Sequence, residues 1–149
     1  MNVAQEVRER EKLINEAKTW LGTPYHSEAR VKGAGVDCGM FLLQSIENVG
    51  FLPHTEIPHY PVDIACHCAT PRYLMKIQEY CDKVEDGTRK PGDILVFKFK
   101  GSKVPHHAGF VVDKDYMIHA YTRLGVILSN TKGYEAHLYG VYRLKRWCG

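Results

Sequence analysis

Apolar residues recur at helical spacing near the start of the chain. Between Gln5 and Leu21 they fall every three or four positions among charged residues, which is typical of one amphipathic helix. Gly22, Thr23 and Pro24 then interrupt the pattern and are expected to end the helix. The first predicted element is therefore a surface helix with one buried face.

A second helix is predicted after a glycine-containing loop over residues 30–36. Asp37 is a favourable N-cap for the apolar run over residues 40–49, and a glycine closes that run. The pattern therefore places Cys38 in the first turn of a buried helix.

The residues that follow are rich in proline, which excludes long regular structure until a third helix begins. That helix is expected to open at Pro71 and to end near Cys81. Beyond the turns at Asp86–Gly87 and Pro91–Gly92, the apolar pattern alternates as it does in strands. Five strands are predicted, at Asp93–Phe99, His107–Val112, Tyr116–Ala120, Gly125–Ser129 and Leu138–Leu144. Helices followed by a mainly antiparallel sheet indicate an α+β fold, and we expect one domain over residues 1–149.

Composition and charge narrow the classes of function. The 149 residues are 44% apolar and 25% charged, as in an ordinary globular protein, and the net charge is only +3. This small excess gives no basis for a nucleic-acid partner. Charged residues cluster between positions 6 and 12, so we expect synthesis in the cytoplasm without a signal peptide, and no membrane insertion. Five cysteines without regular spacing indicate reduced thiols.

Cys38 is the first candidate for chemistry. A thiol attacks as its thiolate, and a helix N-terminus and a nearby imidazole both stabilise that form. Gly33, Gly35 and Gly39 allow tight turns that bring main-chain N–H groups close to a bound substrate. The alternative interpretation of Cys38 is a small buried side chain at the start of a core helix.

Two histidines lie on consecutive predicted strands. Alternation puts His107, Gly109 and Val111 on one face of the first strand, and we expect Gly109 to leave room for a helix end. His119 on the next strand can hold the tautomer of His107, in place of an Asp or Asn. Tyr25 is a further candidate, because its phenol can donate a hydrogen bond to an oxyanion. Each of these side chains alone is as consistent with ordinary packing.

Five short blocks occur in order along the chain. They are Leu21–Tyr25, Gly35–Gly39, Pro91–Leu95, His107–Val111 and Ile118–Ala120. Together they resemble the signature blocks of the NlpC/P60 cysteine peptidases, in the order of the unpermuted members, with the cysteine before the histidines. The segments Val31–Cys38 and His59–Asp63 resemble the phage and prophage tail-associated branch of that family.

The resemblance implies a papain-like core, with the N-terminal helices packed on the five-stranded sheet, and no cofactor. It implies Cys38 as the nucleophile, His107 as its base and His119 as the partner that orients the base. The implied oxyanion and substrate-binding residues are Tyr25, Asp37 and Gly39. The implied substrate is the stem peptides of peptidoglycan, cleaved at peptide bonds through a thioester. The implied setting is the virion, with phage tail proteins as partners and the cell wall as target.

One position departs from the family pattern. Gly39 and Met40 follow the cysteine where the family commonly has Ser and Gly, so a hydroxyl beside the nucleophile is missing. The detailed substrate preference of the family therefore cannot be transferred to this chain.

Alternatives remain open beside this interpretation. Candidate metal ligands cluster at His59, Cys66, His67, Cys68 and Cys81. Cys66 and Cys68 are closer than the usual spacing of zinc ligands, so we expect no metal. The segment from Pro53 to Pro71 is instead expected to form a lid or wall over the active site. The chain could also be a non-catalytic tail module, or an amidase or acyltransferase that uses the same cysteine.

Overall fold

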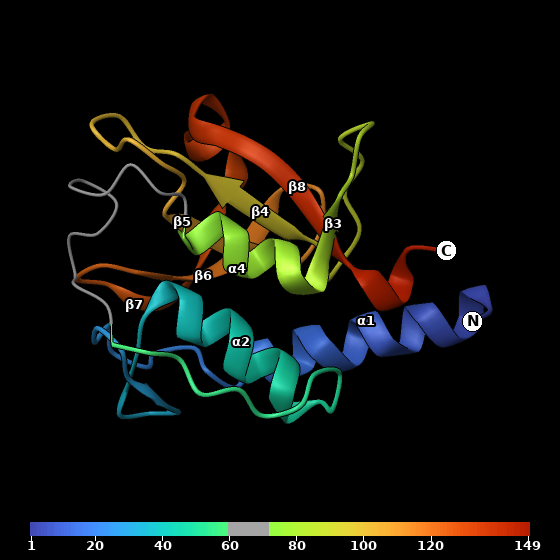
Figure 1. The fold of residues 1–149 in the computed structure, drawn as a ribbon, viewed down its shortest axis with the longest axis horizontal. Helices are drawn as coiled ribbons and strands as arrows, with labels where there is room; N and C mark the ends of the chain where they lie inside the picture. The colour runs from blue at the N-terminus through green and yellow to red at the C-terminus, as the bar shows by residue number, and fades with distance from the viewer. Residues whose placement is uncertain (60–71) are drawn as a thin grey trace.

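The computed structural model describes residues 1–59 and 72–149, and all its helices and strands lie in these ranges (Figure 1). The α-helices are α1 (Val3–Lys18), α2 (Cys38–Asn48) and α4 (Arg72–Tyr80). The strands are β1 (Arg30–Val31), β2 (Gly35–Val36), β3 (Cys81–Lys83), β4 (Ile94–Phe97), β5 (His107–Val111), β6 (Tyr116–Tyr121), β7 (Gly125–Asn130) and β8 (Leu138–Leu144). Two 3-10 helices complete the described set, η1 (Thr131–His137) and η2 (Lys145–Trp147).

Six strands form one antiparallel sheet in the order β3-β8-β4-β5-β6-β7, and β1 and β2 form a separate small hairpin. The predicted α+β class is confirmed. The strand count was one too low for this sheet, because β3 follows directly on α4 and is only three residues long. Cys81, predicted as the end of the helix, begins this strand and pairs with Leu144 of β8. Its conformation comes from a neighbour distant in sequence, which a local pattern does not reveal.

The first helix is shifted toward the N-terminus relative to its prediction over Gln5–Leu21. Asn2 caps it, since its side-chain oxygen accepts a hydrogen bond from the Gln5 N–H at 2.8 Å. Beyond Lys18 the chain forms tight turns that keep Trp20 buried without continuing the helix. The apolar periodicity therefore extends past the end of the helix. Among the described helices, none has the length and apolar character needed to span a membrane.

The helices α1 and α2 cover one face of the sheet, and the main core lies between them (Figure 1). The Phe41 ring on α2 makes edge contacts with Trp20 and with Phe110 on β5. Side chains of the opposite face form a second cluster under η1, made of Leu95, Phe97, Val111, Met117 and Val141 with partly buried neighbours. The alternation predicted for β5 is confirmed, since Ala108 and Phe110 face the helices and Val111 faces the second cluster.

A buried ion-pair cluster fixes α1 to the sheet. Asp93 is fully buried and accepts hydrogen bonds from Arg10 at 2.9 Å and from Arg143 at 2.8 Å. The backbone N–H of Lys90 also donates to this carboxylate. Because removal of one partner would leave a buried charge uncompensated, we infer that the Asp of the Pro91–Leu95 block is structural.

Candidate active site

Cys38 is the first residue of α2, and its position is set by the residue before it. Asp37 is buried, and its two carboxylate oxygens accept from the N–H groups of Met40, at 2.8 Å, and Glu28, at 2.7 Å. The predicted N-cap is confirmed. The same carboxylate also holds the preceding loop against the helix start, so Cys38 lies at the positive end of the α2 dipole in a fixed backbone frame.

Tyr25 lies beside Cys38. The segment around Tyr25 pairs with Val36 in a short parallel bridge, where the His26 N–H donates to the Val36 carbonyl at 3.1 Å. The Tyr25 phenol is thereby within hydrogen-bonding range of the backbone and side chain of Cys38. Burial, together with the neighbouring Cys38 and Asp37, raises the pKa of Tyr25 well above its usual range. The phenol therefore remains a protonated hydrogen-bond donor.

A glycine supports this arrangement from the sheet. Gly125 begins β7 with a φ of +77°, and a Cβ at this position would overlap the Thr23 carbonyl oxygen. Hydrogen bonds from the Gly22 N–H to the Val126 carbonyl and from the Val126 N–H to the Thr23 carbonyl tie the two segments together. The close approach places the residues before Tyr25 directly on the start of β7.

Cys38 also meets the start of β5. Its sulfur lies 3.6 Å from the carbonyl oxygen of His106, and His107 is the next residue and the first of the strand. His106 itself precedes β5 and packs its ring against Phe99, as expected for a loop residue. The fold therefore brings the helix start and the strand start together across 68 positions of sequence.

His107 and His119 form a direct hydrogen bond. His107 Nε2 and His119 Nδ1 are 2.7 Å apart, and both side chains are buried. The register of β5 with β6 pairs Phe110 with Ile118, so the two histidines are diagonal neighbours on one face of the sheet. The predicted proximity of the two imidazoles is therefore present in the structure.

The expected role of Gly109 was wrong. It was predicted to leave room for a helix end, whereas a Cβ there would lie 2.9 Å from His119 Cβ and 3.0 Å from the Ile118 carbonyl oxygen. The reason is the alternation of β5: α2 packs on the face of Ala108 and Phe110, and Gly109 faces the other way. The missing side chain makes space for His119.

Ser129 on β7 was not predicted as a member of the site. Its Oγ lies 2.8 Å from Nε2 of His119, the ring nitrogen that His107 does not occupy. In the register of β6 with β7, Ser129 lies opposite Met117 and diagonal to His119. Alternation along β7 was a usable signal for the face of Ser129, but the strand register was needed to place it beside His119.

Aromatic rings surround the two histidines. Phe99 and Tyr121 lie 5.5 and 5.6 Å from the His107 ring, and Tyr134 lies 5.4 Å from the His119 ring. Burial lowers the pKa of His107 well below its usual value, and the adjacent His119 and His106 lower it further. Burial lowers the pKa of His119 to about 4. Both imidazoles are therefore neutral near pH 7, and His107 is a base rather than a permanent cation.

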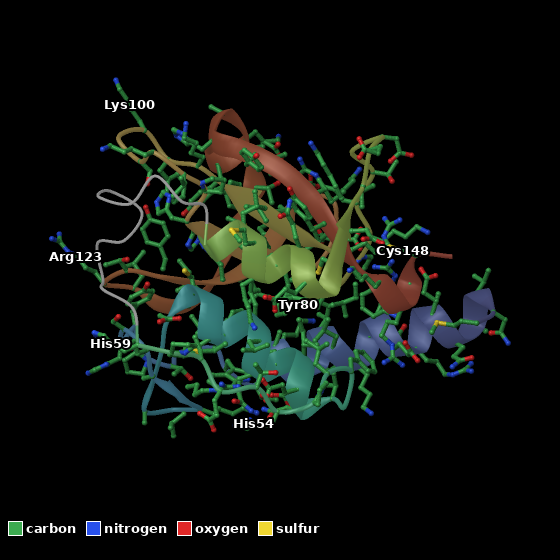
Figure 2. All side chains as sticks on the ribbon, in the orientation of Figure 1. His54, His59, Tyr80, Lys100, Arg123 and Cys148 are labelled. Atoms are coloured by element: carbon green, nitrogen blue, oxygen red, sulfur yellow. The ribbon has the colours of Figure 1, made fainter. Side chains whose placement is uncertain are left out.

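The remaining candidates lie around this centre or outside the described residues. Gly39 is half-buried in the first turn of α2, next to Cys38. Cys66, Cys68 and most of the predicted lid lie outside the described residues, so these predictions stay untested. Among residues 1–59 and 72–149, no three His, Cys, Asp or Glu side chains gather as a metal site. Figure 2 shows two further histidines, His54 and His59, on the chain beside α2, where they pair with glutamates.

Comparison with known proteins identifies the family. A curated relative, the "Probable endopeptidase" of Haemophilus influenzae, is 28% identical over 118 residues, which are 79% of this chain. The aligned part covers 63% of that relative's length.

Solved structures share the fold. NlpC1 from Trichomonas vaginalis superposes with a TM-score of 0.67 at 21% identity, over 91% of this chain and 44% of the other. The peptidoglycan hydrolase RipB from Mycobacterium tuberculosis superposes with a TM-score of 0.61 at 20% identity, over 95% of this chain and 67% of the other. The family model described as "NlpC/P60 family" matches residues 22–143, a range that includes Tyr25, Cys38, His107 and His119. This chain belongs to the NlpC/P60 family.

Proposed function

We propose that this protein is a cysteine hydrolase that cleaves amide bonds in the stem peptides of peptidoglycan. The observation that carries the proposal is the meeting of Cys38, at a capped helix start, with the strand start that holds the His107–His119 pair. Family membership and the similarity to an endopeptidase and to a peptidoglycan hydrolase support the substrate class.

The mechanism assigns one role to each group. The Cys38 sulfur attacks the carbonyl carbon of the scissile amide, and its proton passes to Nδ1 of His107, the nitrogen that does not face His119. The oxyanion forms beside the α2 N-terminus and the Tyr25 hydroxyl, with Gly39 leaving space for the substrate. His107 then protonates the leaving amine, and a water molecule, deprotonated by His107, hydrolyses the thioester. Asp37 acts indirectly, since it holds the helix start.

Replacement of the two reacting groups tests this mechanism. Cys38→Ala and His107→Ala should each lower kcat/KM by roughly a thousandfold or more, because the thioester route needs both. His119→Ala should retain a higher residual rate, since His119 orients the base without touching substrate. The measurement is digestion of purified peptidoglycan, with the released fragments identified by mass spectrometry.

The exposed thiol of Cys148 provides the matched control, and Cys148→Ala should digest the wall as the wild type does. Full digestion by Cys38→Ala would contradict the proposal. Fragments that carry new α-amino and carboxyl ends within the stem peptide identify peptidase activity. Cleavage between the sugar and the peptide would instead establish the amidase alternative.

We also propose that the protein acts from a phage or prophage tail, on the basis of the segments Val31–Cys38 and His59–Asp63. In this setting it reaches the cell wall with the virion and needs no signal peptide. Immunodetection of the chain in purified virions tests the assignment, and its absence from intact particles would contradict it.

A further inference from the structure

The hydroxyl of Ser129 lies at the end of a hydrogen-bond chain that begins at His107. The first link joins His107 Nε2 to His119 Nδ1 at 2.7 Å, and the second joins His119 Nε2 to Ser129 Oγ at 2.8 Å. The links come from three adjacent strands, β5, β6 and β7, so their spacing is fixed by the sheet. Both nitrogens of His119 are therefore engaged.

The direction of this chain decides whether His107 can act as a base. An imidazole whose Nδ1 accepts a proton from Cys38 must carry a hydrogen on Nε2, which then donates to Nδ1 of His119. His119 must in turn carry its own hydrogen on Nε2, and Ser129 must accept it. In the reverse direction Ser129 donates, and the hydrogen of His107 lies on Nδ1, where no proton can be accepted.

We propose that Ser129 is a positioning residue of this site, which accepts a hydrogen bond from His119 and so holds His119 in the Nε2–H tautomer that orients His107. The proposal rests on the proposed function, because it assigns His107 as the base. A serine serves here because its hydroxyl accepts the bond without adding a charge to the aromatic enclosure formed by Tyr134 and its neighbours.

The tautomer can be measured without catalysis. Nitrogen NMR of the intact protein with 15N-labelled histidine should show His119 protonated on Nε2 and unprotonated on Nδ1, with the signals assigned by a His119→Gln variant. In Ser129→Ala the Nδ1–H form should become populated. Ser129→Thr keeps the hydroxyl and should restore the wild-type tautomer. Ser129→Cys, with a similar volume and a weaker acceptor, should also shift the tautomer if the Ala variant does not fold.

Ser45 provides a matched control for the loss of a hydroxyl. It is buried in α2, and its Oγ has no hydrogen-bond partner among the described residues, so Ser45→Ala should leave the His119 signals unchanged. An unchanged tautomer in a folded Ser129→Ala or Ser129→Cys variant would overturn the proposal. So would a wild-type His119 that is protonated on Nδ1.

Kinetics provides the second measurement. Ser129→Ala should lower kcat by about tenfold, the loss expected for one hydrogen bond of about 1.4 kcal/mol, with KM nearly unchanged because Ser129 does not contact substrate. Ser129→Thr should recover most of the rate. If Cys38→Ala proved fully active, the proposed function would fail while the NMR result still reported on Ser129. An Ala variant with wild-type kcat would reject the positioning role.

Discussion

At the scale of single residues, burial keeps the groups around the nucleophile uncharged. It raises the pKa of Tyr25 and lowers the pKa of both His107 and His119, because removal from water disfavours the phenolate and the imidazolium alike. The site therefore holds a neutral donor and a neutral base at neutral pH. Charge develops there during the reaction, where the α2 N-terminus and the histidine pair can stabilise it.

The lowered histidine pKa predicts a loss of stability in acid. An unfolded histidine has a pKa near 6.5, whereas that of folded His119 is about 4, so the unfolded chain binds the proton first as the pH falls. The penalty is absent above about pH 6.5 and reaches about 3 kcal/mol for His119 near pH 4. Urea unfolding of wild type and His119→Gln between pH 7 and 4.5 should show a shallower decline for the variant. Parallel declines would contradict the assignment.

At the scale of elements, the site depends on two connections that bring a loop onto a regular element. Asp37 ties the loop at Glu28 to the start of α2, and Gly125 lets Thr23 and Pro24 lie on the start of β7. Tyr25 follows immediately after that contact. The oxyanion donor therefore owes its position to a glycine about a hundred residues away in sequence.

Gly125→Ala should disturb both the fold and the site. The new methyl group meets the Thr23 carbonyl, and the residue must keep a positive φ, so we expect a loss of roughly 2 kcal/mol or more. Displacement of Tyr25 should also reduce kcat in the fraction that remains folded. Gly133→Ala is the control, since a Cβ at Gly133 has no atom within 4 Å. Equal unfolding free energies for the two variants, measured in urea, would refute the close-approach argument.

At the scale of the whole molecule, basic side chains gather at the end of the sheet that holds the site. The β4–β5 and β6–β7 connections meet the strands at His107 and Tyr121, and they contain four exposed basic residues and no acidic residue. These are Lys98, Lys100, Lys103 and Arg123. Lys100 and Arg123 project outward from this end in Figure 2, whereas both termini lie at the opposite end in Figure 1. The arrangement favours approach of an anionic polymer.

This charge distribution predicts that added salt slows the reaction. The kcat/KM on soluble peptidoglycan fragments should fall as ionic strength rises, since exposed charges are screened over about 10 Å at 0.1 M salt. A Lys100→Glu/Arg123→Glu double variant should lower kcat/KM severalfold at low salt and flatten the salt dependence. Arg8→Glu, an equally exposed site on α1 near the termini, should change neither. A salt dependence that is the same in all three proteins would exclude this role.

Much of the framework was predictable from sequence, for local reasons. Asp37 as N-cap, Cys38 in the first turn, and the alternation of β5 around His107 and Ala108 follow from backbone geometry and residue type within a few positions. The five predicted strands also correspond to described strands, with ends shifted by a few residues. The order of the blocks, with the cysteine before both histidines, was enough to predict the NlpC/P60 family.

Strand register and packing decided the rest, because they depend on residues far apart in sequence. Pairing of Phe110 with Ile118 puts Gly109 beside His119, and pairing of Met117 with Ser129 brings the serine to the free nitrogen of His119. A slip of one residue would have turned these side chains to the other face. The sequence alone therefore determined which groups can react, whereas the tertiary structure decided which atoms meet, since hydrogen bonds between distant strands fix positions that no local pattern encodes.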